Sequence, residues 1–194
     1  AAPQNPFVDG VFVPDRDSSE VVSSTGLRFE DCPDTTGTAF YHISTIRDIP
    51  AIGSSETYFL ALSEKSGRYP STLLLHSNAG ITYDLSVIRA HYTNWQVTSF
   101  ATSYGFPASL YEKIAKAPGD DQVRSSGAGT VNFYILIDGK IRRKIPFVMG
   151  MQPKSVQIPI SDQDRFLSLV CTDSDGNNSY DWLVLENPKL FLEE

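Results

Sequence analysis

Oxygen-bearing side chains recur at alternate positions near the carboxyl end of the chain. Asp173, Asp175 and Asn177 are spaced two residues apart, Asp181 follows, and Glu186 lies a little further on. Carboxylate and amide oxygens at such spacing are typical of loops that bind Ca²⁺. An EF-hand is excluded, because it requires glycine at the sixth loop position and glutamate at the twelfth. The segment therefore predicts either a structural calcium ion held by these five residues or a solvated turn.

The other chemically capable residues do not form a catalytic pattern. The histidines His42, His76 and His91 lack the spacing of metal ligands, and no cysteine or carboxylate completes a zinc set. The glycine-rich stretch 125–129 contains serines, but it has no strand-turn-helix context for a nucleophile and is typical of a loop. Carboxylate pairs for glycoside hydrolysis depend on a separation that only the fold sets. We therefore expect a protein that is not an enzyme.

Short strands must position these residues. Runs that are apolar or that alternate between apolar and polar residues are separated by turn-forming residues about every 8 to 12 positions. They lie at 11–13, 21–22, 27–29, 40–43, 57–62, 71–76, 81–85, 94–102, 131–137, 141–147, 155–160, 166–172 and 181–186.

Helical signals are few by comparison. Residues 108–116 have helical spacing, and 86–90 look like a brief helical turn. There is no alternation of strands with helices, no internal repeat and no linker, which predicts an all-β antiparallel sandwich with one short helical insertion. We expect a single domain over residues 1–194, in which residues 1–10 form an extended leader with few contacts.

The longest strands are expected to form a hairpin about Asp138-Gly139. A two-residue turn there would place cations opposite the apolar residues. A three-residue loop, with Gly139 in the left-handed conformation, would instead pair Ile135 with Ile141 and Val131 with Ile145. Burial of one apolar face favours the three-residue loop.

The net charge argues against two classes of partner, and the two cysteines allow at most one disulfide. The net charge of -7 and a pI near 4.9 argue against nucleic acid or an anionic membrane. No apolar run approaches the ~20 residues of a membrane span. The first residues, from Ala1, fit either a mature terminus left by signal cleavage or a fragment boundary. Cys171 is expected as a buried thiol, and a disulfide with Cys32 is left open.

Four stretches of the chain, in this order, resemble the NPCBM family of carbohydrate-binding modules. They are 76–85, 100–105, 129–140 and 167–177, the last running on to Asp181-Trp182. Together they cover about residues 73 to 190. The chain departs from the family at two places: His76 alone remains of a Gly-x-Gly-x-His-Ala stretch, and Phe106-Pro107 replaces an acidic pair. The resemblance implies a jelly-roll sandwich of the galactose-binding-domain-like type, as found attached to secreted bacterial glycosidases.

The resemblance also implies a function. It suggests a non-catalytic module of a larger protein that is secreted, periplasmic or at the cell surface, with a galactose-type glycan and the other domains as partners. Sugar binding needs an aromatic face and polar groups for the hydroxyls. The candidate contacts are His76, Asn78, Tyr92, Trp95 and Tyr104. For His76 the alternative is a structural pin to neighbouring backbone. The alternative for the whole domain is a structural or protein-interaction sandwich that has lost sugar binding.

Overall fold

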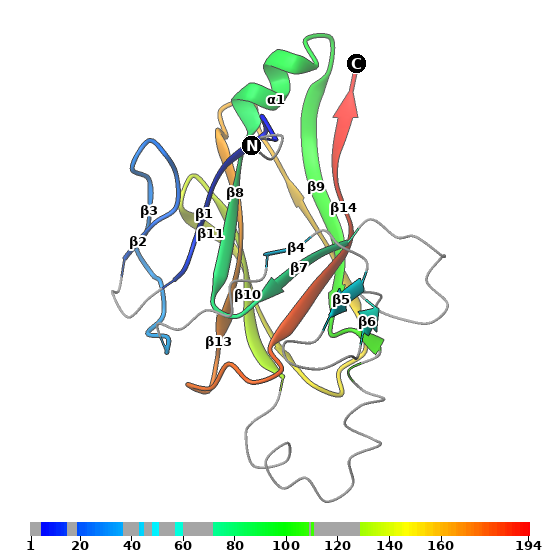
Figure 1. The fold of residues 1–194 in the computed structure, drawn as a ribbon. Coiled ribbons are helices and arrows are strands. Elements are labelled where there is room, and N and C mark those ends of the chain that lie inside the picture. The colour runs from blue at the N-terminus through cyan, green and yellow to red at the C-terminus, as the bar shows by residue number, and fades with distance from the viewer. Residues whose placement is uncertain are drawn as a thin grey trace, which may run out of the picture.

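The computed structural model describes residues 5–14, 19–36, 72–108, 110 and 129–194, together with the backbone of three short strands near residues 43–59. Fourteen strands and one helix are present in this part of the chain (Figure 1). Their bounds are β1 Val8–Phe12, β2 Glu20–Val21, β3 Arg28–Phe29, β4 Ile43–Ser44, β5 Asp48–Pro50, β6 Thr57–Phe59, β7 Thr72–His76, β8 Ala79–Asp84, α1 Leu85–His91, β9 Gln96–Gly105, β10 Thr130–Ile137, β11 Lys140–Val148, β12 Lys154–Pro159, β13 Phe166–Asp173 and β14 Trp182–Glu193.

Most of the strands form two five-stranded antiparallel sheets. Sheet I has the order β1-β8-β13-β10-β11, and sheet II has the order β12-β9-β14-β7-β4. Two small hairpins, β2-β3 and β5-β6, complete the described strands. The expected all-β sandwich is confirmed, and the strands are longer than predicted at β9 and β14.

The main core lies between the two sheets. Phe133 and Ile135 of sheet I have no exposed surface, and neither do Leu183 and Leu185 of sheet II. Alternate residues of each strand supply this core, because successive side chains of a strand point to opposite faces. Burial of such side chains contributes about 1.5–3 kcal/mol each, which makes this core the main source of stability.

The outer face of sheet I is also covered. Tyr134, Leu136 and Val170 pack there against Val22 and Phe29, which the β2-β3 hairpin brings across the sheet. The central strands β10 and β13 are therefore buried on both faces, and all eight residues of β13 are buried. The sequence pattern of residues 131–137 predicted one buried face, whereas residues on both faces of β10 are buried.

The β10-β11 hairpin differs from the prediction. The turn has two residues, Asp138 and Gly139, both with positive φ (52° and 76°), as a two-residue hairpin turn requires. A bulge adds Arg142 to β11, so that Ile135 pairs with Arg143 while the next apolar pair, Phe133 with Ile145, forms beyond it. The bulge relieves the conflict that argued against a two-residue turn at Phe133, which pairs with Ile145, although Arg143 still lies opposite Ile135. Ile141 packs on the opposite face from Ile135.

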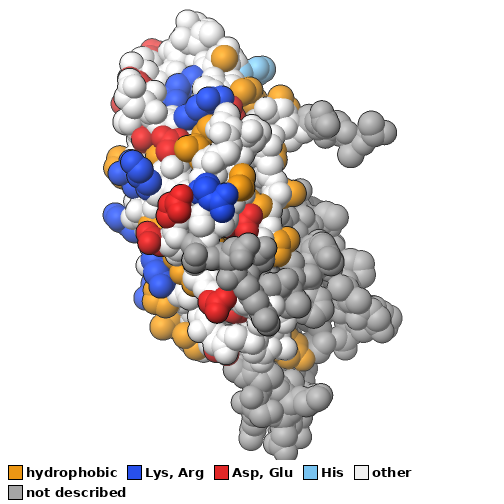
Figure 2. Space-filling view, turned by 90° about the vertical axis from the view of Figure 1, so that its left-hand side faces the viewer, with side chains coloured by type: hydrophobic (Ala, Val, Ile, Leu, Met, Phe, Trp, Pro, Cys, Tyr) orange, Lys and Arg blue, Asp and Glu red, His pale blue; other side chains and the backbone are white. Residues whose placement is uncertain are grey.

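Charged side chains protect the exposed edge of sheet I. Strand β11 is one of the two edge strands of this sheet, and its Arg142 forms an ion pair with Asp164 at 3.6 Å. Figure 2 shows basic and acidic side chains interspersed on the side of the molecule at the left of Figure 1. Charges on an edge strand oppose pairing with another chain.

Three further expectations need correction or fall outside the described residues. The leader expected at residues 1–10 is wrong from Phe7 onward, since Phe7 O accepts a hydrogen bond from Asp84 N at 3.0 Å and Val8 begins β1. The helix expected at 108–116 lies outside the described residues except at 108 and 110. Cys32 and Cys171 are both buried, on opposite faces of sheet I, and no disulfide joins them. Within the described residues, no helix has the length and apolar character to cross a membrane.

Candidate functional site

Several of the sequence-predicted polar residues meet at one end of the sandwich, between the β7-β8 turn and the β13-β14 loop. Asn78 has no exposed surface, and its amide donates to Asp173 Oδ2 at 2.7 Å while Asn78 Oδ1 accepts from Asp173 N at 2.8 Å. Thr36 donates to the same Asp173 oxygen from its backbone N (3.1 Å) and its hydroxyl (2.9 Å). The polar groups of Asn78 and Asp173 thus satisfy each other inside the fold.

Asp181 is the second buried carboxyl group at this end. Its oxygens accept hydrogen bonds from the Ser77 hydroxyl at 2.9 Å and from Thr130 N at 2.9 Å. Burial raises the pKa of Asp181 to about 8, although these two hydrogen bonds act in the opposite direction. Asp181 therefore joins three separate segments of the chain.

His76 ends β7 beside these residues and is almost fully buried. Its Nδ1 lies 2.7 Å from the carbonyl oxygen of Ser77, and its ring centroid lies 6.2 Å from that of Trp182. A backbone hydrogen bond inside the fold is what the structural-pin alternative predicted. We name His76, Ser77, Asn78, Asp173 and Asp181 the loop-end cluster.

The five residues predicted to bind calcium do not form one ligand set, although Asp173 and Asp181 both belong to the loop-end cluster. Asp175 and Asn177 accept local backbone hydrogen bonds, from Asn177 N and Ser179 N, each at 3.0 Å. Glu186 lies four residues along β14 from Trp182, on the outer face of sheet II. In the described ranges, no group of three or more His, Cys, Asp or Glu could hold a metal ion. Calcium binding stays a prediction.

The aromatic candidates separate into two groups. Tyr104 is 5% exposed and belongs to the core, where its ring packs against Phe133 and Phe147. Tyr92 and Trp95 are 40% and 42% exposed, and they share one turn, since Trp95 N donates to Tyr92 O at 2.9 Å. This turn follows α1, at the end of the sandwich opposite the loop-end cluster. The five predicted sugar contacts therefore do not form one site.

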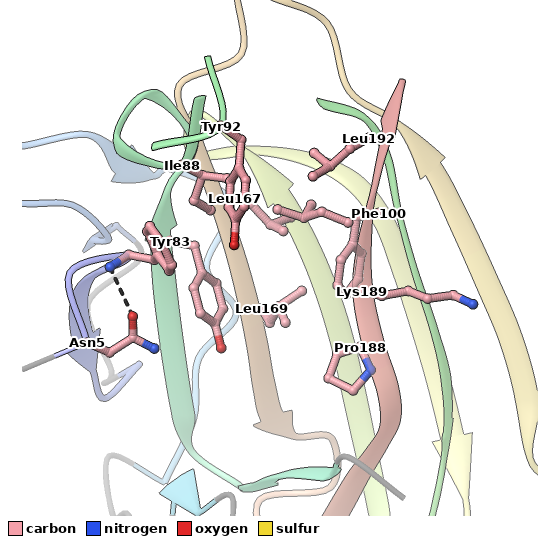
Figure 3. A pocket seen from close by; sticks show the side chains of 12 residues that line it. Asn5, Tyr83, Ile88, Tyr92, Phe100, Leu167, Leu169, Pro188, Lys189 and Leu192 are labelled. Carbon is pink, nitrogen blue, oxygen red and sulfur yellow. Dashed lines mark hydrogen bonds between the residues drawn. The ribbon is translucent and has the colours of Figure 1, made fainter. Parts of the chain in front are cut away.

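A cavity of about 330 Å³ opens at the α1 end, between the two sheets (Figure 3). We name it the aromatic cleft. Tyr83 and Tyr92 line one side, and their hydroxyl groups point into it (Figure 3). Aliphatic and aromatic side chains from both sheets form the rest of the wall, among them Phe7, Phe100, Leu167 and Leu192.

Local structure fixes the rim of the cleft. Asp84 caps α1 by accepting hydrogen bonds from Ser86 N (2.8 Å) and Val87 N (3.1 Å), which sets the direction of the helix that carries Tyr92. The Phe7 ring lies 6.4 Å from that of Tyr92, and Asn5 Oδ1 accepts a hydrogen bond from Phe7 N at 3.0 Å. The start of the chain is thereby part of the rim.

The chemistry of the aromatic cleft is mixed. Burial raises the pKa of Tyr83, so its hydroxyl stays neutral and can both donate and accept a hydrogen bond. Tyr92 offers a partly exposed ring above an apolar wall. Such a site can bind a ligand with one apolar face and a few hydroxyl groups.

Sequence reasoning missed most of this cleft. Tyr83 alternates with Ile81 on the core face of β8, and that alternation was the available signal. Phe7 and Asn5 lie in a segment that the proline content had suggested was a loose leader. Tyr92 is the one predicted sugar contact that lines the cleft.

Comparison with known proteins decides the family. The model of the NPCBM/NEW2 domain matches residues 54–191, which is more than half of the chain. The chain belongs to the NPCBM/NEW2 domain family. It is thus a non-catalytic carbohydrate-binding module, as the resemblance in sequence implied. No curated protein matches the chain.

Solved structures share the fold of this NPCBM domain. The CBM51 module of a Clostridium perfringens GH95 protein, in complex with methyl-galactose, has a TM-score of 0.52 and 15% identity, and the match covers 79% of this chain and 90% of that one. The tandem CBM51 modules of Sp3GH98 from Streptococcus pneumoniae give 0.50 and 15%, with 96% and 45% covered. The CBM51-2 and INT domains of C. perfringens ZmpB give 0.50 and 14%, with 94% and 29% covered. The chain thus spans less than a third of that ZmpB structure.

Proposed function

We propose that this NPCBM domain binds its glycan in the aromatic cleft. The observation that carries the proposal is the position of Tyr92, a partly exposed ring at the mouth of a cavity into which the Tyr83 hydroxyl also points. A pyranose can lay its C–H face on an aromatic ring while its hydroxyls bond to nearby polar groups. The cavity volume of about 330 Å³ lies at the lower end of the range of small-molecule sites.

The chemistry of the cleft favours one or two neutral sugar rings. The wall beneath Tyr92 is apolar, and Tyr83 and Asn5 add polar groups at its edge. Lys189 is the cation of the lining, but its ammonium extends away from the cavity (Figure 3). An anionic sugar would therefore lose hydration against the apolar wall without a cation placed to pair with it. The GH95 module whose fold this chain shares was solved with methyl-galactose, which makes galactosides the first ligands to test.

The role of the module would be to hold a larger protein near its polysaccharide. The ZmpB and Sp3GH98 structures contain several domains, so we infer that this chain is also one part of a multidomain protein that is secreted or displayed at the cell surface. Weak binding by one module is useful in such a protein, because tethering raises the effective concentration of the other domains at the substrate. The affinity of a single shallow site is expected to be low.

A structural or protein-interaction domain is the second candidate. It is favoured by the apolar Leu73-Leu74-Leu75 run, which stands where the family has glycines, and by Phe106-Pro107, which replaces an acidic pair. Leu75 and Phe106 are fully buried, so both departures serve packing in this chain. A failure of this domain to bind any glycan would support this alternative.

The test is a glycan array followed by titration of the galactosides that bind. Tyr92→Ala should lower the affinity roughly tenfold, since it removes the exposed ring at the mouth of the cleft. Val87→Ala is the matched control, because Val87 is an exposed apolar residue of the same helix that does not line the cleft. Binding that survives Tyr92→Ala would place the sugar elsewhere, and the absence of any binding would favour the second candidate.

A further inference from the structure

The outer face of sheet II carries a second hollow, of about 440 Å³, on β9, β12 and β14. Its shape follows from the strand register. Strand β9 lies between β12 and β14, and its outward-facing residues are small, namely Ser99, Ala101 and Ser103. Longer side chains flank them on either side, since Gln157 of β12 and Lys189 of β14 both pair with Ala101. Small residues between longer ones form a groove that runs along β9, and we name it the outer groove.

A bulge in β14 turns two charged residues toward the outer groove. Glu186 pairs with Ser103 and Lys189 pairs with Ala101. Between these two pairs β14 advances three residues while β9 advances two. Asn187, within the bulge, has a φ of 51°. In a regular strand, residues three apart point to opposite faces, and the bulge is what brings Glu186 and Lys189 to the same face.

Glu186 supplies the acceptor that a ligand would meet. Its Oε1 is buried and accepts no hydrogen bond from any described residue. A buried carboxylate oxygen without a donor is unfavourable, so a donor that reaches it is bound favourably. Ser103 and Ser155 lie beside it, with their hydroxyl oxygens 3.0 Å apart, and they offer further hydrogen bonds.

Phe191 supplies an aromatic surface toward the other end of the groove. It is 38% exposed and pairs with Ser99, and the Lys189 ammonium lies 4.9 Å from its ring centroid. The Gln157 amide donates to Ser99 Oγ at 2.9 Å, which holds the amide beside β9. The lining residues Ala101 to Ser103 span about 7 Å along β9, and Phe191 extends the groove toward Ser99.

We propose that the outer groove is a second carbohydrate site, which takes a short neutral segment of an oligosaccharide. Hydroxyl donors fit Glu186 Oε1, planar amide and hydroxyl groups line the floor, and Phe191 accepts the C–H face of a sugar ring. A sulfate or uronate next to Glu186 would meet a like charge, and the Lys189 ammonium is engaged with the Phe191 ring, so neutral sugars are favoured. The proposal rests on the carbohydrate-binding function of the family but not on the aromatic cleft, which lies on the opposite face of β14.

Electrophoresis in native gels that contain a soluble neutral polysaccharide tests the proposal. The probes are galactan, arabinogalactan, galactomannan and xyloglucan, each with polysaccharide-free gels as reference. Glu186→Ala is expected to weaken retardation roughly tenfold, and Phe191→Ala about fivefold, in terms of apparent dissociation constant. Glu193→Ala, a loss of the same charge at an exposed position of the same strand, should leave retardation unchanged.

The outcomes separate the two sites. Loss of retardation in Glu186→Ala and Phe191→Ala, with unfolding midpoints close to that of the unaltered protein, supports the outer groove whatever Tyr92→Ala does. Gln157→Ala provides a third groove variant at an exposed position in case one of the others is destabilised. If the groove variants are retarded like the unaltered protein while Tyr92→Ala is not, the outer groove is overturned and the aromatic cleft stands. Failure of all four polysaccharides to retard the protein would overturn both sites.

Discussion

Asn78 and Asp173 bind each other through two reciprocal hydrogen bonds, Asn78 Nδ2 to Asp173 Oδ2 (2.7 Å) and Asp173 N to Asn78 Oδ1 (2.8 Å). The two residues are 95 positions apart in sequence and join the start of β8 to the end of β13. Both are buried, so neither pair of groups has water as a substitute partner. Asn78, whose amide would suit a sugar hydroxyl, therefore has a structural role in this fold.

The first prediction follows from that pair. Asn78→Ala should lower the free energy of unfolding by about 2–4 kcal/mol, because it leaves the buried Asp173 groups without two of their partners. Asn177→Ala, which removes a local hydrogen bond in a more exposed loop, should cost less than about 1 kcal/mol. Urea unfolding measures both. Equal effects of the two substitutions would contradict the role given to Asn78.

The second prediction concerns the pH dependence of stability. The pKa of Asp181 is raised by burial to about 8, whereas an Asp in an unfolded chain titrates near 3.9. The folded state therefore holds this proton more tightly, and its stabilising effect is full below about pH 4 and is lost as the pH rises through 8. From pH 6 to pH 9 this group should reduce the free energy of unfolding by roughly 2 kcal/mol.

Asp181→Asn isolates that effect. The amide oxygen can still accept from Thr130 N and the amide nitrogen can donate to the Ser77 hydroxyl, so the contacts are kept while the titration is removed. The variant should lose most of the decline in melting temperature between pH 6 and pH 9. Asp162→Asn, at an exposed position whose charge is not among those that act on Asp181, serves as control and should keep the decline. An unchanged pH profile in Asp181→Asn would show that another group titrates.

The third prediction concerns the β10-β11 turn. A Cβ on Gly139 would lie 2.2 Å from the carbonyl oxygen of Arg28, and Gly139 also has a positive φ. Gly139→Ala should therefore lower the free energy of unfolding by about 2–4 kcal/mol. Gly26→Ala is the matched control, since Gly26 has a similar φ of 82° but open space around it, and it should cost only about 1 kcal/mol. Equal losses of unfolding free energy in the two variants would mean that the β2-β3 hairpin does not pack closely against this turn.

The fourth prediction concerns the thiols. Burial raises the pKa of the Cys171 thiol well above its ordinary value, and Cys32 is buried on the other face of sheet I. A thiol-reactive dye should therefore label the native protein slowly and label two groups per chain after unfolding without reductant. The melting temperature should not change on addition of a reducing agent. An unfolded chain that presents no free thiol would reveal a disulfide and contradict the structure.

The sequence predicted the strands well where alternation was strong. Residues 131–137 and 166–172 were assigned correctly, because apolar residues recur there with a period of two. It could not reveal that Tyr134 and Leu136 are buried as well, since their cover comes from Val22 and Phe29, more than 100 residues earlier. The predicted register of the β10-β11 hairpin was wrong for a related reason. A bulge at Arg142 costs little locally but shifts every pair beyond it.

The candidate site was harder to predict than the fold. His76 and Asn78 have side chains suited to sugar hydroxyls, but burial, which a sequence does not show, assigns their hydrogen bonds to the chain itself. Tyr92 and Trp95 were recognised by residue type. Tyr83, which lines the cleft together with Tyr92, lies in a strand pattern that also describes a core residue. The outer groove depends on a bulge that brings Glu186 and Lys189 to one face, and no local signal marks that bulge except Asn187-Pro188.

The central claim is that the sugar occupies the aromatic cleft at the α1 end. The most direct test is a crystal structure of the protein with a bound galactoside. The account predicts a sugar ring against the face of Tyr92, with one of its hydroxyls within hydrogen-bonding distance of the Tyr83 hydroxyl. A galactoside bound instead beside Trp182, at the loop-end cluster, would contradict it.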